Sequence, residues 1–197
     1  KKDLRFKGFF RTMIFLPCTT SLVAYSIIFR SLFANDGLVN YVLVNLGILD
    51  KPYNFLTQPF AAKMVIILAL LWRWTGYNMV FFLSGLQNIE YSVYEAAKID
   101  GASAIQTFFK ITVPLLKPTI LLTAIMSTNG TLQLFDESIN LTDGGPANAS
   151  ISMSHYIYNL CFKYVPNFGY AAAMSFFILL LVAVLALIQM RVGDKRD

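Results

Sequence analysis

Long apolar stretches separated by short polar segments make up most of this chain. Four of them are long enough to cross a bilayer as helices, because a hydrocarbon core about 30 Å thick needs roughly 20 residues at 1.5 Å rise each. They cover residues 9–34, 61–86, 115–139 and 169–190. The last stretch has no charge over residues 171–189. The pattern predicts an all-α, polytopic transmembrane helical bundle, forming a single domain over residues 1–197.

Composition supports a membrane setting. Of the 197 residues, 56% are hydrophobic and 14% are charged, whereas a soluble domain has about 25% charged residues. A soluble bundle would need more polar surface to coat helices of this length. The first stretch also contains Pro17, Thr19, Thr20 and Ser21. Membrane helices tolerate such residues where neighbouring helices provide hydrogen-bond partners for the freed backbone groups. We therefore expect this helix to pack among others rather than to face lipid.

Basic residues gather at one side of the predicted bundle. On that side the flanking segments contain Lys1, Lys2, Arg5, Lys7, Arg11, Lys98, Lys110, Lys117, Arg191, Lys195 and Arg196. The other side contains Lys51 and Lys163, with Lys63 at a boundary. Cytoplasmic loops carry an excess of Lys and Arg, so we expect both termini and the loop over residues 87–114 to be cytoplasmic. The net charge of +5 then reflects topology, and no nucleic-acid partner is expected.

The loop over residues 87–114 predicts two short helices around a glycine. Glu95, Ala96 and Ala97 favour a helix, and Asp100-Gly101 ends it, because glycine adopts the left-handed conformation without a side-chain penalty. A second helix is expected to begin near Ala102 or Ser103. Farther on, Pro114 and Pro118 mark the start of the next span, because proline fits best near the beginning of a helix.

This loop resembles the EAA motif of ABC importer permeases: Glu-Ala-Ala, three residues, Gly, nine residues, Ile, any residue, Leu, Pro. The chain follows the spacing from Glu95 through Gly101 and Ile111 to Pro114, with Val113 in place of Leu. The resemblance implies a coupling helix that sits in a groove of a separate ATPase subunit. Its expected coupling residues are Glu95, Ala96, Ala97, Asp100, Gly101, Ala102 and Pro114. The alternative is an amphipathic linker helix on the membrane surface.

A second likeness narrows the family. The segment Leu141-Thr142-Asp143-Gly144-Gly145-Pro146 is similar to a glycine-rich loop of carbohydrate importers, in the subunit resembling the larger maltose-importer permease. Gly144-Gly145-Pro146 also predicts a tight external turn. With Phe10-Arg11-Thr12 and Phe168-Gly169-Tyr170, the likeness covers nearly the whole chain. Members usually carry a further span upstream, and because this chain begins at Lys1 without Met, we expect missing N-terminal sequence.

The resemblance implies a multi-pass subunit of the bacterial cytoplasmic membrane that imports a sugar or oligosaccharide. The implied partners are a second homologous permease, two ATP-binding-cassette ATPase subunits and an extracellular or periplasmic solute-binding protein. No Gly-x-x-x-x-Gly-Lys-Ser/Thr loop is present in the sequence, so ATP and Mg are expected on the ATPase and no cofactor on this chain. Glycerol phosphate or a polyol is an alternative solute.

Two polar clusters within the spans are candidates for the substrate pathway. Asn129 and Gln133 lie four residues apart, and therefore on one helix face; their amides suit sugar hydroxyls. Trp74, Tyr77 and Asn78 form a stripe on the preceding span, where an aromatic ring can cover a pyranose. Polar residues inside spans tend to face a bundle interior or cavity. Packing between helices is the alternative for both clusters.

The remaining polar residues support fewer hypotheses. Arg73 is expected to pair with a carboxylate or to extend toward the interface, and alternatively to attract an anionic solute. Asp136 and Glu137 are expected at a hydrated outer helix end, as a gate, a contact for the binding protein or a solvated terminus. His155, expected on the outer loop, has no ligand-spaced Cys or paired carboxylate, so no metal site is expected.

Two other classes of protein are less consistent with the sequence. An intramembrane hydrolase could use Asp136, Ser154 and His155, although nothing in their spacing brings them together. An ion-coupled transporter would show inverted repeats, which the sequence lacks. Cys18 and Cys161 fall at different expected depths and are predicted to be unpaired thiols.

Overall fold

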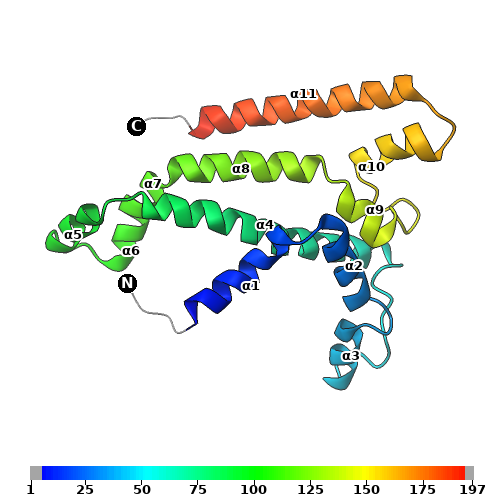
Figure 1. Ribbon diagram of the computed structural model, residues 1–197, viewed down its shortest axis with the longest axis horizontal. Helices are drawn as coiled ribbons and strands as arrows, with labels where there is room; N and C mark the ends of the chain where they lie inside the picture. The colour runs from blue at the N-terminus through cyan, green and yellow to red at the C-terminus, as the bar shows by residue number, and fades with distance from the viewer. Residues whose placement is uncertain (1–5, 194–197) are drawn as a thin grey trace.

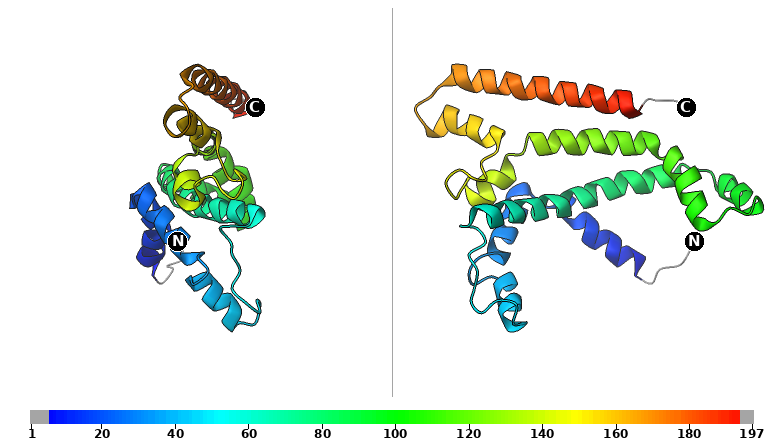
Figure 2. Two further views of the ribbon diagram at one scale, coloured as in Figure 1. Left: turned by 90° about the vertical axis from the view of Figure 1, so that its right-hand side faces the viewer. Right: turned by 180° about the vertical axis from the view of Figure 1, so that it is seen from behind.

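The computed structural model describes residues 6–193 as an elongated helical assembly (Figures 1 and 2). Three long helices run side by side along its length: α4 (Pro59–Gln87), α8 (Lys117–Leu132) and α11 (Phe168–Gly193). The shorter helices are α1 (Lys7–Thr19), α2 (Leu22–Leu32), α3 (Leu38–Asn45), α5 (Tyr91–Ile99), α6 (Ala104–Thr107), α7 (Val113–Leu115), α9 (Asp136–Thr142) and α10 (Met153–Tyr158). Two π-helical turns, Phe108–Thr112 and Asn159–Lys163, complete the described elements.

Within residues 6–193, two helices, α4 and α11, are each long and apolar enough to cross a membrane, and two bent helix pairs reach the same length and apolarity only when their two parts are taken together. Helix α4 begins with Pro59, whose fixed φ and missing N–H suit the first helical position. Helix α11 spans 26 residues and has the most apolar window, with a mean hydropathy of 2.9. These helices occupy the second and fourth predicted spans.

The first predicted span is not one continuous helix. Helices α1 and α2 meet at an angle of 110°. Pro17 lies in the last turn of α1 and lacks the N–H of the regular ladder, and Thr20 then takes an extended conformation with ψ 142°. As a result α2 turns aside, and with α3 it extends sideways at the end of the bundle opposite α5 (Figures 1 and 2).

The third predicted span is also interrupted. Helix α8 ends at Leu132, and α9 begins separately at Asp136. On its other side, α8 is bent by 65° from the segment that ends at Leu115. Pro118 lies in the first turn of α8, where proline is accepted, so the new helix starts in a new direction.

A buried apolar cluster lies where α2, α4 and α9 meet. Tyr25, Ile66, Ala69 and Leu141 form this cluster. Elsewhere many large apolar side chains are exposed, for example Phe176 (62%) on α11. A surface of this kind suits lipid or partner helices better than water.

Helices α1 and α4 cross closely at Gly76. A Cβ atom at this position would lie 2.1 Å from the carbonyl oxygen of Ile14, so only glycine permits the observed approach. Small residues commonly allow backbones of membrane helices to come this close.

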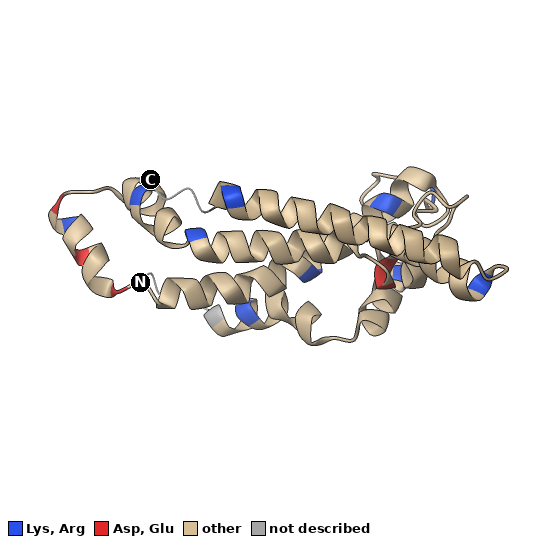
Figure 3. Ribbon diagram, turned by 90° about the horizontal axis from the view of Figure 1, so that it is seen from above, with Lys and Arg blue, Asp and Glu red and all other residues tan. Residues whose placement is uncertain are grey.

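Charged residues lie mainly toward the two ends of the bundle (Figure 3). The start of α1 and the end of α11 lie at the same end as α5 (Figure 1). Of the basic residues used to predict topology, Lys1, Lys2, Arg5, Lys195 and Arg196 lie outside the described residues.

Candidate functional site

The loop between α4 and α8 forms a helix–glycine–helix elbow, here defined as residues 91–107. Helix α5 ends in a complete Schellman motif: the N–H of Ala102 donates to the carbonyl of Ala97 at 2.9 Å, and the N–H of Gly101 donates to that of Lys98 at 3.2 Å. Gly101 has the left-handed φ of 73° that this motif requires. The predicted end of the helix at Asp100-Gly101 is therefore confirmed.

The second arm of the elbow is fixed by a capping box. The N–H of Ser103 donates to Oε1 of Gln106 at 2.8 Å, and the N–H of Gln106 donates to Oγ of Ser103 at 3.3 Å. Helix α6 accordingly begins at Ala104, just after the expected start. The sequence Ser-x-x-Gln was the signal that could have revealed this cap.

The predicted coupling residues differ in accessibility. Exposed positions on the elbow include Glu95, Ala96, Asp100 and Gly101, and Pro114 is also exposed. Ala97, by contrast, is only 5% exposed and Ala102 is half-buried. The exposed residues are therefore free to meet a partner, whereas Ala97 supports the elbow from within.

A cleft of about 1110 Å³ lies between the end of α4 and the elbow. Its lining includes Leu86, Glu90, Tyr94, Glu95 and Lys98. The hydroxyls of Tyr94 and Thr112 lie 3.3 Å apart, which connects α5 to the π-helical turn before α7. The elbow thus combines a rigid backbone with a concave, mixed-charge surface.

The aromatic stripe of α4 packs against α8. Asn78 Nδ2 donates to Ser127 Oγ at 3.2 Å, and Ser127 Oγ can donate back to Asn78 Oδ1 at 3.3 Å. Tyr77 Oη lies 3.8 Å from Met126 Sδ. A Cβ atom on Gly130 would lie 2.3 Å from the ring of Trp74, so the indole rests directly on this glycine. These contacts match the packing alternative considered for Trp74, Tyr77 and Asn78.

The other predicted cluster lies on a different side of α8. Gln133 Nε2 donates to Asn129 Oδ1 at 2.7 Å, and both residues are exposed. Gln133 lines a hollow of about 550 Å³ with Ser154 and Ser175, whereas Asn129 lines a smaller hollow of about 50 Å³ beside α11. The structure therefore does not join the two predicted clusters into one cavity.

Arg73 forms an ion pair with a buried carboxylate. Its Nη1 lies 2.9 Å from Oε1 of Glu137, which is 2% exposed, and the hydroxyl of Tyr25 donates to the same oxygen. The expectation that Arg73 pairs with a carboxylate is confirmed. The expectation that Glu137 is hydrated is wrong, because α9 folds back against α2 and α4 and encloses this side chain. Asp136, by contrast, is half-buried.

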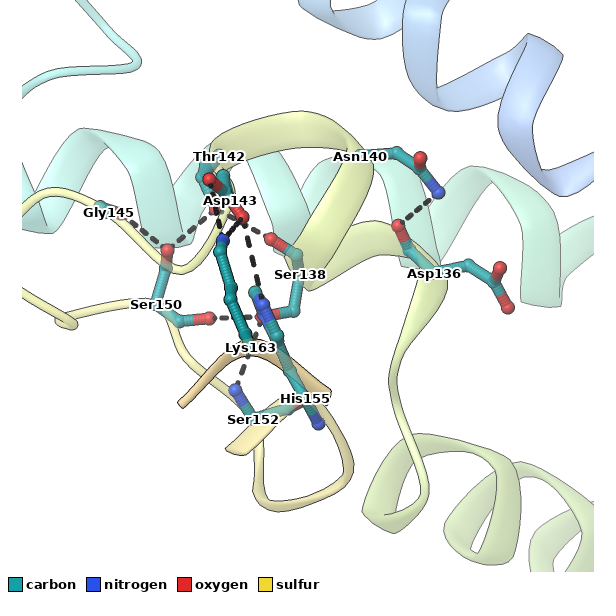
Figure 4. Close-up of polar contacts among 10 residues, drawn as sticks. All are labelled: Asp136, Ser138, Asn140, Thr142, Asp143, Gly145, Ser150, Ser152, His155 and Lys163. Carbon is teal, nitrogen blue, oxygen red and sulfur yellow. Dashed lines mark hydrogen bonds and ion pairs between the residues drawn. The ribbon is translucent and has the colours of Figure 1, made fainter. Parts of the chain in front are cut away.

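His155 is buried rather than exposed on the outer loop. Its Nδ1 lies 2.9 Å from Ser138 Oγ, which itself donates to the carbonyl of Ser150 (Figure 4). Nε2 of His155 faces Oδ1 of Asp143 at 3.8 Å. Lys163 Nζ binds the same carboxylate at 2.9 and 3.1 Å.

The hydrolytic set considered from sequence is not assembled. The serine that contacts His155 is Ser138, not Ser154, and the carboxylate of Asp136 points away from the cluster (Figure 4). Burial lowers the pKa of His155, although the nearby Asp143 carboxylate opposes this shift. The hydrogen bond to Asp143 raises the pKa of Lys163. Cys18 and Cys161 are free thiols, as predicted.

Comparison with known proteins identifies the family. A family model described as "Binding-protein-dependent transport system inner membrane component" matches residues 2–196. The lactose transport system permease protein LacF of Rhizobium radiobacter is 56% identical over 195 residues, covering 98% of this chain and 65% of LacF. The chain thus spans less than two thirds of this relative's length.

Two solved structures share the fold. The structure of a bacterial ABC transporter involved in the import of the acidic polysaccharide alginate matches with a TM-score of 0.85 and 25% identity, covering 98% of this chain and 68% of that chain. A bacterial alginate ABC transporter in complex with an alginate pentasaccharide-bound periplasmic protein matches with a TM-score of 0.76 and 26% identity, covering 98% and 66%. The predicted helical transmembrane fold and the resemblance to ABC importer permeases are confirmed. The chain belongs to the family of binding-protein-dependent transport system inner membrane components.

Proposed function

We propose that this chain is a membrane-spanning subunit of an ATP-binding-cassette importer that carries a sugar or oligosaccharide across the bacterial cytoplasmic membrane by alternating access. The observation that carries the proposal is its 56% identity to a lactose permease protein over 98% of the chain. In this role the chain is not an enzyme. ATP and Mg bind to the partner ATPase subunits.

The elbow is the proposed coupling site. Its backbone is hydrogen-bonded at both arms by the Schellman motif and the capping box, which define the turn between α5 and α6. The small exposed residues Ala96 and Gly101 permit close approach of another protein, and Glu95 offers a charge beside them. A merely amphipathic linker would not need this rigid turn. We place the elbow and both ends of the chain in the cytoplasm.

The proposed assembly contains a second homologous permease, two ATPase subunits and a solute-binding protein. The exposed apolar side chains of the long helices suit contact with lipid and with the second permease. The complex of the alginate transporter with a periplasmic protein supports a binding protein at the outer end.

A carbohydrate is favoured as the solute. LacF belongs to a lactose transport system, and the solved structure is of a transporter involved in the import of alginate. Asn129 and Gln133 remain proposed pathway residues, because their exposed amides line hollows beside α11. Trp74, Tyr77 and Asn78 also remain proposed pathway residues. Their contacts with α8 would hold that helix in place beside the pathway. Glycerol phosphate is less favoured, since the charge of Arg73 is engaged by Glu137.

The test is uptake by the complete complex in proteoliposomes that enclose ATP, with the binding protein outside. We expect ATP-dependent uptake of a labelled sugar. Gly101→Pro and Glu95→Ala should lower uptake at least tenfold without changing the affinity of the binding protein for the sugar. Lys51→Ala, an exposed change in the first loop, serves as the control. Normal uptake with both elbow variants would overturn the coupling assignment.

A further inference from the structure

Three helices are joined through a single carboxylate oxygen. Arg73 on α4 and Tyr25 on α2 both donate to Oε1 of Glu137 on α9. Tyr25 is fully buried and Glu137 is 2% exposed. A carboxylate removed from water needs such partners, because an unpaired buried charge is strongly unfavourable. The positions of α2 and α9 relative to α4 are therefore tied to this contact.

The contact has a defined place in the chain's architecture. Helix α4 is continuous from Pro59 to Gln87 and is separated from α5 of the elbow only by residues 88–90. Helix α9, by contrast, is separated from the end of α8 by the non-helical residues 133–135. A movement of α4 therefore has a direct path to α9 through Arg73, whereas α8 meets α9 through a break.

We infer that Arg73 is a positioning residue for transport, which through Glu137 fastens an outer cap formed by α2 and α9 to α4. The cap then follows the helix that carries the elbow, and the outer end of the bundle moves together with the coupling site. This inference rests on the proposed function.

Direct contact with an anionic solute is the competing role for Arg73. The guanidinium group is already shared between Glu137 at 2.9 Å and the ring of Trp74, whose centroid lies 5.9 Å away. Its side chain is 31% exposed. A solute contact would show as a change in the half-saturating solute concentration. A positioning role would show in the amount of solute moved per ATP.

Neutral variants separate positioning from simple support of the fold. Arg73→Gln or Glu137→Gln alone leaves the other charge without its partner, so assembly is expected to suffer. The double variant Arg73→Gln/Glu137→Gln removes both charges, and its assembly should recover. If the pair only supported the fold, transport would recover with assembly. If it positions the cap, transport per ATP stays low.

The experiment uses the complete complex in proteoliposomes, with assembly checked by size-exclusion chromatography. We expect the assembled double variant to move at least fivefold less sugar per ATP than wild type, with an unchanged half-saturating concentration. Arg73→Lys, which keeps the charge, should retain most of this ratio, and Arg30→Gln, an exposed change on α2, should retain all of it. A wild-type ratio in the double variant, or a change confined to the half-saturating concentration, would overturn the inference.

A second readout does not depend on transport. Cysteines placed on α4 and α9, in a chain whose Cys18 and Cys161 are replaced by Ser, report whether the two helices stay together. We expect the double variant to cross-link at least fivefold less efficiently than the wild-type pair. An unchanged yield would contradict the positioning role. If wild-type complex transports no sugar, the proposed function fails, while this yield still decides the inference.

Discussion

The hydroxyl of Ser138 lies 2.9 Å from Nδ1 of His155, and both side chains are fully buried. This contact joins α9 to α10 across the loop that contains Gly144. The loop packs closely on the ring, since a Cβ atom on Gly144 would lie 3.3 Å from Cε1 of His155. The imidazole ring of His155 is thus enclosed between α9, α10 and this loop.

This outer cluster should loosen in acid. Because burial lowers the pKa of His155, the unfolded chain binds a proton more readily than the folded chain. The stability that neutral His155 contributes is therefore complete above its ordinary pKa of about 6.5 and is lost as the pH falls below that value toward the lowered folded pKa. After correction for intrinsic rates, hydrogen exchange of residues 138–155 should accelerate as the pH falls from 7.5 to 5.

A His155→Gln variant provides the control for this prediction. Its amide can still donate to Ser138 but does not titrate, so its exchange should lack the additional acceleration below neutral pH after correction for intrinsic rates. Equal acid responses in the variant and the wild type would show that another group causes the loosening.

Gly76→Ala should weaken the crossing of α1 and α4. The added methyl would meet the carbonyl of Ile14 at 2.1 Å, so the helices must move apart. Overpacking of this kind costs about 1–3 kcal/mol. Thermal unfolding in detergent measures the loss. Gly8→Ala on α1, where nothing lies within 4 Å, is the matched control, and an equal effect of both changes would refute the close-contact explanation.

Gly101→Ala should destabilise the elbow by about 1 kcal/mol, because a Cβ is strained at a φ of 73°. Crowding is not the cause, since no atom lies within 4 Å of the position that the alanine Cβ would take. Gly101→Asn should cost less, as asparagine tolerates the left-handed region. Hydrogen exchange at the amides of residues 101 and 102 checks the order. Faster exchange for Asn than for Ala would contradict it.

Thr128→Val should slightly weaken the contact of α11 with α8. Gln189 Nε2 donates to Thr128 Oγ1 at 2.8 Å, and hydrogen bonds between membrane helices contribute about 0.6 kcal/mol on average. The efficiency of cross-linking between cysteines on the two helices should fall by less than about threefold. Thr131→Val, an exposed change on the same helix, should have no effect, and a similar loss in both variants would argue against this bond.

The sequence predicts some parts of this structure well for physical reasons. Helix α11 is uniformly apolar and α4 begins with a proline, so length and hydropathy are enough to place both. The left-handed turn at Gly101 follows from local chemistry, since glycine adopts the left-handed conformation that ends a helix without a side-chain penalty. In each case the information lies within one segment.

Other features depend on contacts between distant segments. Apolar residues continue on both sides of the break near Thr20, so hydropathy does not reveal that α2 turns by 110°. Arg73 and Glu137 are 64 residues apart, and a charge near a predicted helix end gives no sign that it will be buried. His155 likewise acquires its partner Ser138 only when α9 and α10 pack together.

The role of the elbow as a coupling site depends on the side of the membrane on which Ala96 lies and on the protein that covers it. Ala96→Cys, in a chain whose Cys18 and Cys161 are replaced by Ser, can be treated with a membrane-impermeant maleimide in oriented vesicles. We predict labelling only in inside-out vesicles, with protection when the ATPase subunits are bound. Labelling from the outer side, or no protection by the ATPase, would contradict the coupling role.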